Sequence, residues 1–394
     1  MRGKRYIRFI LIYVLLGLSF TASAMKQDSI RFSLLTCSPG TEIYSLFGHT
    51  AIRYQNGSRN VDVVFNFGMF SFDAPHFLYR FVKGETDYRL GVIPYPYFES
   101  EYALRGSSVY EQELNLTGDE KQRLLSILQE HYLPENREYR YNYFYDNCTT
   151  RARDCIERAL SGEVVYPDSL PNKTFRSIVH EFTKNYPWST FGIDLCLGAQ
   201  ADETIGARLQ MFAPFYMRDY AGGAYIVDRN GEKRKLIAEE NLIIDAEPDE
   251  EISAPFLSPN VVFFLFLLVS LFVSWLQWKR KRAFWAWDTL LYLVQGLAGC
   301  VIAFLFFFSE HPTVGSNWLL IFFNPLPLLC LPYVIYCDVK RKKDIFHRVV
   351  TVYLTLFILI IPFSPQEIDL SVLSLALGFL ANSISHVLIR EEDK

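Results

Sequence analysis

Residues 260–278 read NVVFFLFLLVSLFVSWLQW, an apolar run without a charged side chain. A helix of about 20 apolar residues is long enough to cross the hydrocarbon core of a bilayer. Further apolar runs follow, and the predicted spans are residues 260–278, 284–308, 318–337, 347–363 and 368–389. The last span is the weakest, because Ser and Asn residues dilute it. The sequence therefore predicts an all-α transmembrane bundle of about five helices.

Two basic clusters set the expected orientation of this bundle. Residues 279–282 (KRKR) lie between the first two spans, and residues 340–343 (KRKK) lie between the third and the fourth. Both clusters are expected in the cytoplasm, because positively charged loops are retained there. The segment 309–317 carries little positive charge and is expected outside, facing the exported part of the chain. Alternation then places residues 25–258 outside.

The amino terminus has the pattern of an export signal. Basic residues at positions 2–8 precede an apolar run, and Ala22-Ser23-Ala24 fits the small-x-small cleavage pattern, although an uncleaved anchor helix is an alternative. The segment that follows such a signal is expected outside the cytoplasm. The predicted segments are a signal peptide (1–24), an exported catalytic domain (25–245), an acidic linker (246–259), the bundle (260–389) and a cytoplasmic tail (390–394).

The exported segment has the pattern of an α+β domain. Alternating apolar residues predict strands near 30–35, 50–54 and 61–67, and Asn56-Gly57 predicts a tight turn that joins the last two in a hairpin. Thr117 followed by Glu120 fits a capping box for a helix that runs to about His131. A second helix is expected from about 146–148 to Leu160, and residues 220–245 return to strand-like and turn-like patterns.

Two short motifs carry the chemistry. His49 follows Phe47-Gly48 and opens a predicted strand, whereas Cys148 follows Asp146 and Asn147, both good N-cap residues, and opens a predicted helix. The N-terminus of a helix carries a partial positive charge, which favours a thiolate over a thiol. Its free N–H groups are also suited to an oxyanion. A His on a neighbouring strand is placed to take the thiol proton.

The order of these motifs resembles that of circularly permuted papain-like enzymes, of which lecithin–retinol acyltransferase is an example. Such folds use a further polar residue to orient the His. The predicted hairpin places Asn66 roughly across from His49, and Asp62 is the alternative because the register is not fixed. The candidate catalytic residues are therefore Cys148, His49 and Asn66.

The other cysteines of the exported segment argue against a catalytic Cys148, because they offer it disulfide partners. Cys37, Cys148, Cys155 and Cys196 are even in number, which permits two disulfides. Cys155 is two helical turns after Cys148 and is expected either in the core or paired with Cys37 or Cys196. No paired CxxC spacing indicates a zinc cage, and we expect no cofactor and no metal. The net charge of −4 gives no sign of a nucleic-acid partner.

Taken together, the motifs resemble those of the Lnb-type lipoprotein N-acyltransferases, which are multi-spanning envelope proteins with an N-terminal periplasmic domain. The resemblance covers most of the chain and rests on residues 37–40, 47–50, 65–68, 145–150, 197–198, 311–312, 317–318 and 324–326. Phe65 and Phe67 stand where tyrosines are more usual.

This resemblance implies a membrane-anchored acyltransferase that acts on the N-terminal cysteine of bacterial lipoproteins. It also implies a location in the bacterial inner (cytoplasmic) membrane, with the N-terminal domain on the periplasmic side. Cys148 would form a thioester, and His49 would serve as the base. The implied partners are the membrane, a lipoprotein substrate and an acyl donor, either a phospholipid or the lipoprotein's own diacylglyceryl group. His311, Asn317 and Asn324 are polar groups near or within the bilayer, which often mark function.

Two other functions compete with this one. A papain-like thiol hydrolase of envelope peptides or amides would use the same dyad, although such substrates do not require five spans. A non-enzymatic sensor or assembly factor, stapled by disulfides, would not need a free Cys148. A fatty acyl thioester on Cys148 separates the first function from the hydrolase.

Overall fold

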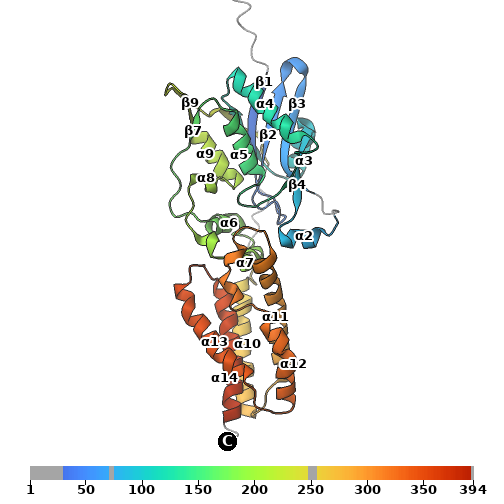
Figure 1. Cartoon of the computed structure of the whole chain (residues 1–394), viewed down its shortest axis with the longest axis vertical. Coiled ribbons are helices and arrows are strands. Elements are labelled where there is room, and N and C mark those ends of the chain that lie inside the picture. Colours follow the sequence, from blue (N-terminus) through green and yellow to red (C-terminus); the bar gives the residue numbers. More distant parts are fainter. Residues whose placement is uncertain (1–29, 71–74, 247–254, 392–394) are drawn as a thin grey trace, which may run out of the picture.

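The structure, a computed structural model, describes residues 30–70, 75–246 and 255–391. The predicted signal peptide and most of the predicted linker lie outside these residues. An α+β domain occupies one end of the molecule and a helical bundle the other, and the carboxyl terminus lies at the far end of the bundle (Figure 1). This arrangement confirms the predicted fold class at the level of an α+β domain followed by a bundle. The permuted papain-like fold stays a prediction.

The centre of the α+β domain is a seven-stranded antiparallel sheet with the order β10-β5-β1-β2-β3-β4-β6. Its strands are β1 (Ile30–Cys37), β2 (His49–Asn56), β3 (Val61–Met69), β4 (Asp87–Pro94), β5 (Val109–Leu114), β6 (Glu138–Arg140) and β10 (Ile237–Ile244). The predicted strands of the first third of the chain and the β2–β3 hairpin are confirmed. Asn56 caps a single 3-10 turn, η1 (Gly57–Arg59), so the connection is longer than the predicted tight turn.

Helices cover both faces of this sheet because successive residues of its strands point to opposite faces and are apolar on both. Phe32 and Leu34 pack in the core beneath α4 (Gly118–Tyr132) and α5 (Cys148–Ala159). Leu35 and Cys37 point to the opposite face, where they pack with α3 (Tyr95–Leu104). The capping box of α4 is present as predicted, with the Thr117 hydroxyl accepting from the Glu120 N–H.

A smaller helical layer connects this sheet to the bundle. It comprises α2 (Phe77–Lys83), α6 (Phe175–Thr183), α7 (Pro187–Cys196), η2 (Ala199–Asp202), α8 (Ala207–Gln210) and α9 (Pro214–Gly223), with a three-stranded sheet of β7 (Glu163–Val165), β8 (Tyr225–Val227) and β9 (Lys233–Lys235). A separate apolar core lies beneath α6. In Figure 1, α2, α6 and α7 lie at the top of the bundle.

Four helices of the bundle are long and apolar enough to cross a membrane. They are α10 (Pro259–Arg280), α11 (Trp285–Phe308), α13 (Phe346–Ile360, continued by η5, Ile361–Phe363) and α14 (Leu370–Glu391). The predicted span at 318–337 is not one helix. It consists of the 3-10 turn η4 (Trp318–Leu320), a break at Asn324-Pro325, and the shorter α12 (Leu326–Val339). Pro325 and Pro327 cannot donate the backbone hydrogen bonds that would continue a helix from η4.

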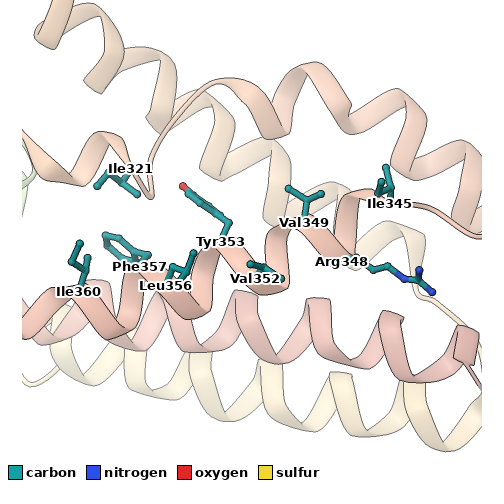
Figure 2. Close-up of a pocket in the computed structure, with 9 residues that line it drawn as sticks. All are labelled: Ile321, Ile345, Arg348, Val349, Val352, Tyr353, Leu356, Phe357 and Ile360. Atoms are coloured by element: carbon teal, nitrogen blue, oxygen red, sulfur yellow. The ribbon is translucent and has the colours of Figure 1, made fainter.

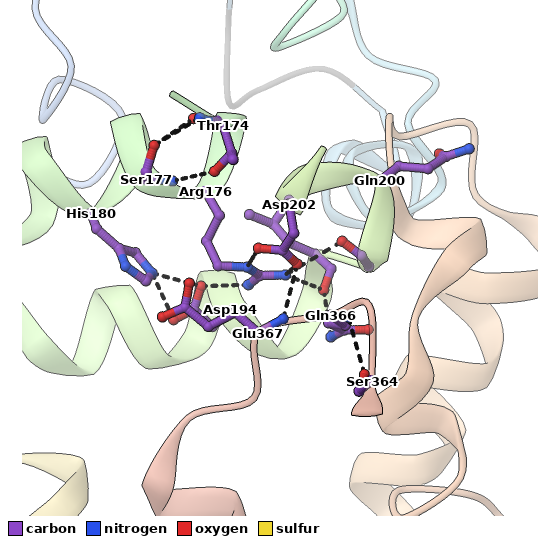
Figure 3. Close-up of polar contacts among 12 residues, drawn as sticks. Thr174, Arg176, Ser177, His180, Asp194, Gln200, Asp202, Ser364, Gln366 and Glu367 are labelled. Atoms are coloured by element: carbon purple, nitrogen blue, oxygen red, sulfur yellow. Dashed lines mark hydrogen bonds and ion pairs between the residues drawn. The ribbon is translucent and has the colours of Figure 1, made fainter. Parts of the chain in front are cut away.

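A network of buried polar groups joins the α+β domain to the bundle (Figure 3). Arg176 on α6 is almost fully buried, and its guanidinium pairs with Asp194 at 2.6 Å and Asp202 at 2.8 Å. Gln366, which follows α13, donates to the Leu197 carbonyl at 3.0 Å, and the Glu367 N–H donates to Asp202 at 3.1 Å. This network fixes α6 and α7 on the bundle.

The loop between α11 and α12 also contacts the α+β domain, as predicted for residues 309–317. The His311 Nε2 donates to the Phe81 carbonyl at 2.6 Å, and the Asn317 amide donates to the Leu195 carbonyl at 2.7 Å. Arg140 pairs with Glu310 at 2.9 Å. The turn η3 (Val314–Ser316) belongs to the same interface, because the Ser316 hydroxyl accepts from the Gln200 N–H at 3.0 Å. His311 and Asn317 therefore hold the two parts together. Asn324 instead donates to Tyr353 within the bundle at 3.0 Å.

Candidate functional site

Cys148 is the first residue of α5, and its position follows from the cap before it. The Asn147 side chain accepts from the N–H groups of Thr149 and Thr150, both at 2.9 Å, and donates to two backbone carbonyls. These bonds satisfy the whole amide and fix the start of the helix. Cys148 is consequently held at the positive end of the helix dipole.

His49 is the first residue of β2 and reaches the same place from the sheet. Gly48 precedes it with a φ of 77°, and a Cβ there would lie 2.4 Å from the Cys37 carbonyl oxygen, so only glycine fits this turn. The His49 Nε2 donates to the Asn66 Oδ1 at 2.6 Å, across the β2–β3 hairpin. This bond leaves Nδ1 as the ring nitrogen that can exchange a proton with a thiol.

The structure brings the three candidate residues together. Cys148 and His49 share a side-chain hydrogen bond, and His49 bonds in turn to Asn66. Asp62, the alternative third residue, lies near the start of β3, opposite Gln55, and pairs with Arg53 at 2.6 Å. Asn66 is therefore the group that orients His49.

The electrostatics of the pair favour the ionised form of both groups. Burial alone would raise the pKa of the Cys148 thiol, but the charge of His49 and hydrogen bonds from His49, the Thr50 N–H and Thr149 outweigh burial and lower this pKa. Burial alone would lower the pKa of His49, but the charge of Cys148 and bonds to Cys148 and Asn66 raise it. These opposite shifts favour a thiolate beside a protonated His49 over the neutral pair.

The other exported thiols have no such partner. Cys155 lies in the core beneath α4 and α5, where burial raises its pKa to about 12. Burial also raises the pKa values of Cys37 and Cys196. All seven cysteines lie in the described parts of the chain, and each is a free thiol. The disulfides that the even count permitted are therefore not formed.

Aromatic residues from two elements surround the thiol. Gly68 on β3 has a φ of 86°, and a Cβ there would lie 3.6 Å from the Cys148 Cβ and 3.7 Å from the Tyr141 ring. The hydroxyls of Tyr139 and Tyr143 are buried and donate no hydrogen bond among the described residues. Burial, together with the nearby Cys148 charge, raises the pKa of Tyr143 well above its usual value, so this phenol stays protonated as a donor.

Aromatic ring contacts lead from the residues around the thiol to the bundle. Tyr141 stacks on Tyr88 at 4.2 Å, and Tyr88 contacts Phe70 at 5.0 Å. Phe70 contacts Phe77 on α2, whose own helix reaches His311 of the bundle through Phe81. The surface of α2 also exposes Leu78 and Tyr79. This apolar path of aromatic rings extends from the residues around the thiol to His311 in the loop after α11.

Sequence reasoning missed the contributions of Thr50, Tyr139 and Tyr143. Thr50 follows His49, and its hydroxyl also contacts Thr149 at 3.0 Å. Tyr143 lies shortly before Cys148 in the chain, so its closeness in sequence was a usable signal. Tyr139 had no such signal, because its position depends on the pairing of β6 with β4.

An apolar groove lies in the bundle and does not belong to this site. It has a volume of about 640 Å³ and runs along α13, with Arg348 at one end and Ile360 at the other (Figure 2). All its lining residues belong to the bundle.

Comparisons with known proteins agree with this division of the chain. Residues 19–181 match the family model described as the Lnb N-terminal periplasmic domain, and residues 249–394 match the Lnb transmembrane domain. The chain belongs to the Lnb family. The first Lnb model includes His49, Asn66 and Cys148, and the second includes the whole bundle. Searches of curated proteins and of solved structures gave no match.

The Lnb models and the apolar helices fit a membrane-anchored, lipoprotein-processing protein with a periplasmic N-terminal domain. The resemblance stated from the sequence motifs is confirmed at the level of the family.

Proposed function

We propose that this protein is a thiol acyltransferase that N-acylates the N-terminal cysteine of lipoproteins. The observation that carries the proposal is the Cys148 thiol, which lies beside the His49–Asn66 pair with a lowered pKa and no disulfide. A buried thiol without an activating partner would show the opposite shift, as Cys155 does. Membership of the Lnb family supports lipoprotein processing as the setting.

In the first step, the Cys148 thiolate attacks the carbonyl carbon of an acyl ester. The C–S bond forms, the ester C–O bond breaks, and the alcohol leaves with the proton that His49 took from the thiol. The bond from His49 Nε2 to Asn66 holds the ring with Nδ1 toward the thiol. The acyl donor is a phospholipid or the diacylglyceryl group of the lipoprotein itself.

In the second step, the α-amino group of the lipoprotein's first cysteine attacks the thioester carbonyl. His49 takes a proton from the amine, the C–S bond breaks, and an amide forms while the Cys148 thiolate is released. The free thiolate then pairs again with the protonated His49. The enzyme returns to its starting state without a cofactor.

Both steps need a donor for the developing oxyanion. The N–H groups of Thr149 and Thr150 already donate to Asn147, so they are not free for this role. The Cys148 N–H and the Tyr143 hydroxyl are the better candidates, because the latter is buried near the thiol and donates to no described group. Among the helix N–H groups expected to bind an oxyanion, we therefore favour that of Cys148, and the Tyr143 hydroxyl is a second candidate donor outside the helix.

The position of the site suits a substrate that lies partly in a membrane. The aromatic path and the exposed face of α2 provide an apolar surface between the thiol and the bundle. We further propose that the α+β domain is periplasmic on the inner membrane and that the basic clusters at 279–282 and 340–343 face the cytoplasm. Both clusters lie at the bundle end remote from the α+β domain (Figure 1).

The proposal is tested by deleting the gene in its host and complementing with wild type, Cys148→Ala or Cys155→Ala. The N-terminal peptide of an abundant lipoprotein is then read by mass spectrometry. We expect acylated amino groups with wild type and Cys155→Ala, and free amino groups with Cys148→Ala at equal expression. Unchanged acylation in the deletion strain would reject the proposal.

A thiol hydrolase of envelope peptides or amides would use the same three residues. The apolar path from the thiol to the bundle favours the acyltransferase, since a soluble peptide substrate gains nothing from it. The third possibility, a disulfide-stapled sensor, is disfavoured because Cys37, Cys148, Cys155 and Cys196 are all free. A hydrolase would turn over a peptide without ever carrying a fatty acyl group on Cys148.

A further inference from the structure

Four buried ionisable side chains meet inside the helical bundle, at the end remote from Cys148. They are Asp288 at the start of α11, Asp338 at the end of α12, His347 at the start of α13 and His386 near the end of α14. One potential ligand atom from each residue lies within 4.8 Å of the other three. Ionisable groups are costly inside a membrane protein, so a cluster of four indicates a function.

The side chains of His347 and Asp288 each have one polar atom in a hydrogen bond and one polar atom without a partner among the described residues. The Nδ1 of His347 bonds to the Tyr292 hydroxyl at 3.3 Å, and that hydroxyl also bonds to Ser383 at 3.0 Å. The Nε2 of His347 has no hydrogen-bond partner among the described residues. Asp288 Oδ1 accepts from Asn382 at 2.6 Å, whereas Oδ2 has no described partner.

This arrangement is the one found around metal ligands. A ligating His normally uses its second ring nitrogen for an outer hydrogen bond, and a ligating carboxylate is held in the same way. Asn382 is itself fixed by Gln277 on α10 at 2.8 Å, so the outer bonds reach the fifth helix as well. A buried donor or acceptor that is left without a partner destabilises the fold.

The second histidine completes the set. The His386 ring stacks on His347 with a centroid separation of 3.7 Å, and its two nitrogens lie 3.1 Å from Asp288 and 3.5 Å from Asp338. Stacked rings this close disfavour a positive charge on both. A cation between the rings and the carboxylates would give His347 Nε2 and Asp288 Oδ2 the partner that they lack among the described residues.

We propose that Asp288, Asp338, His347 and His386 bind one divalent transition-metal ion, with Zn²⁺ as the preferred occupant. Two imidazoles and two carboxylates suit Zn²⁺ in four-coordinate geometry, whereas Mg²⁺ and Ca²⁺ prefer oxygen ligands alone. A cavity of about 10 Å³, lined by His347 and His386, lies beside the cluster. Lys343 and Arg348 also line this cavity.

The bound ion would tie together the ends of α11, α12, α13 and α14. Helix α12 is the shortest of these, and the break at Asn324-Pro325 leaves it without a continuous helical connection to η4. A metal ligand at its far end would compensate by fixing Asp338. The role is structural, at the opposite end of the bundle from the thiol.

The test uses the purified full-length chain with Cys148→Ala, so that the reactive thiol does not bind metal. Bound metal is counted by mass spectrometry of the protein, and Co²⁺ is titrated as a visible probe of four-coordinate geometry. We expect one Zn²⁺ or Co²⁺ per chain and no sulfur-to-cobalt band. Removing the metal with a chelator should lower the thermal unfolding temperature.

Three further variants, in the same background, keep the result interpretable. His347→Gln should abolish stoichiometric binding, and Tyr292→Phe, which preserves the ring packing, should weaken it about 10- to 100-fold. His76→Gln replaces an exposed histidine outside the cluster and should bind like the parent. A parent chain that binds no stoichiometric Zn²⁺ or Co²⁺, equal binding by His347→Gln, or a strong sulfur-to-cobalt band would each overturn the proposal.

Discussion

Replacing His49 with Gln should suppress the reactivity of Cys148 specifically. His49 supplies the largest of the effects that lower the pKa of the thiol, and without it burial is left to raise that pKa. Contact with an opposite charge is worth about 1–3 pKa units, and each unit changes the thiolate fraction about tenfold. Within this chain, Cys155 shows the outcome for a buried thiol with no His beside it, a pKa of about 12.

The assay is alkylation of the purified chain with iodoacetamide at pH 7.5, followed by quantitation of the Cys148 peptide by mass spectrometry. We expect labelling of Cys148 to slow by about 10- to 1000-fold in His49→Gln, following the range for one opposite charge. The Cys196 peptide, from a half-buried free thiol, is the control within each sample and should label equally in both proteins. Equal labelling of Cys148 in wild type and His49→Gln would refute the reasoning.

Three other predictions follow from the same geometry. Asn66→Ala removes the oxygen that accepts from His49 at 2.6 Å and should lower acyl transfer to lipoprotein amino termini about 10- to 100-fold. Asn66→Asp keeps an acceptor at that position and should retain most of the activity. Tyr143→Phe should lower the acylation rate constant about 100-fold with little change in thiol alkylation, and parallel losses in both would contradict an oxyanion role. The hydrogen bond to Asp194 raises the pKa of His180, so its stabilisation is complete below the unfolded pKa of about 6.5 and is lost as pH rises through the folded pKa. Thermal unfolding should therefore show a larger loss of stability between pH 6 and pH 8 in wild type than in His180→Gln.

The helical bundle was predictable because membrane spans are set by local composition. Four of the five predicted spans correspond to α10, α11, α13 and α14. The span at 318–337 was predicted as one helix because apolar length dominated the reasoning. The proline at 325 decides where α12 begins, and Asn324 satisfies the groups freed at the break, donating to the Ile321 carbonyl at 2.9 Å.

The candidate site was predictable in part because local sequence also positions two of its residues. Cys148 follows a strong N-cap, and His49 follows a glycine, so both positions are set by their neighbours in sequence. Asn66 depends on the β2–β3 register, which the longer η1 connection helps to set. Until that register was known, either Asn66 or Asp62 could be the residue that orients His49.

The groups that surround the site could not be assigned from spacing alone. Tyr139 approaches the thiol through the pairing of β6 with β4, which are separated by two helices in the chain. The four residues of the proposed metal site lie on four different helices, so no short spacing connects them. The expectation of no metal rested on the absence of CxxC pairs, which says nothing about such distant ligands.

The most direct test of the central claim is to look for the acyl group on Cys148 itself. The purified chain is incubated with phospholipid vesicles without an amine acceptor, and the Cys148 peptide is analysed by mass spectrometry before and after hydroxylamine. We predict a fatty acyl mass on that peptide that hydroxylamine removes, and no such mass in His49→Gln or on Cys155. An acyl donor that is consumed while Cys148 stays unmodified would contradict the thioester mechanism.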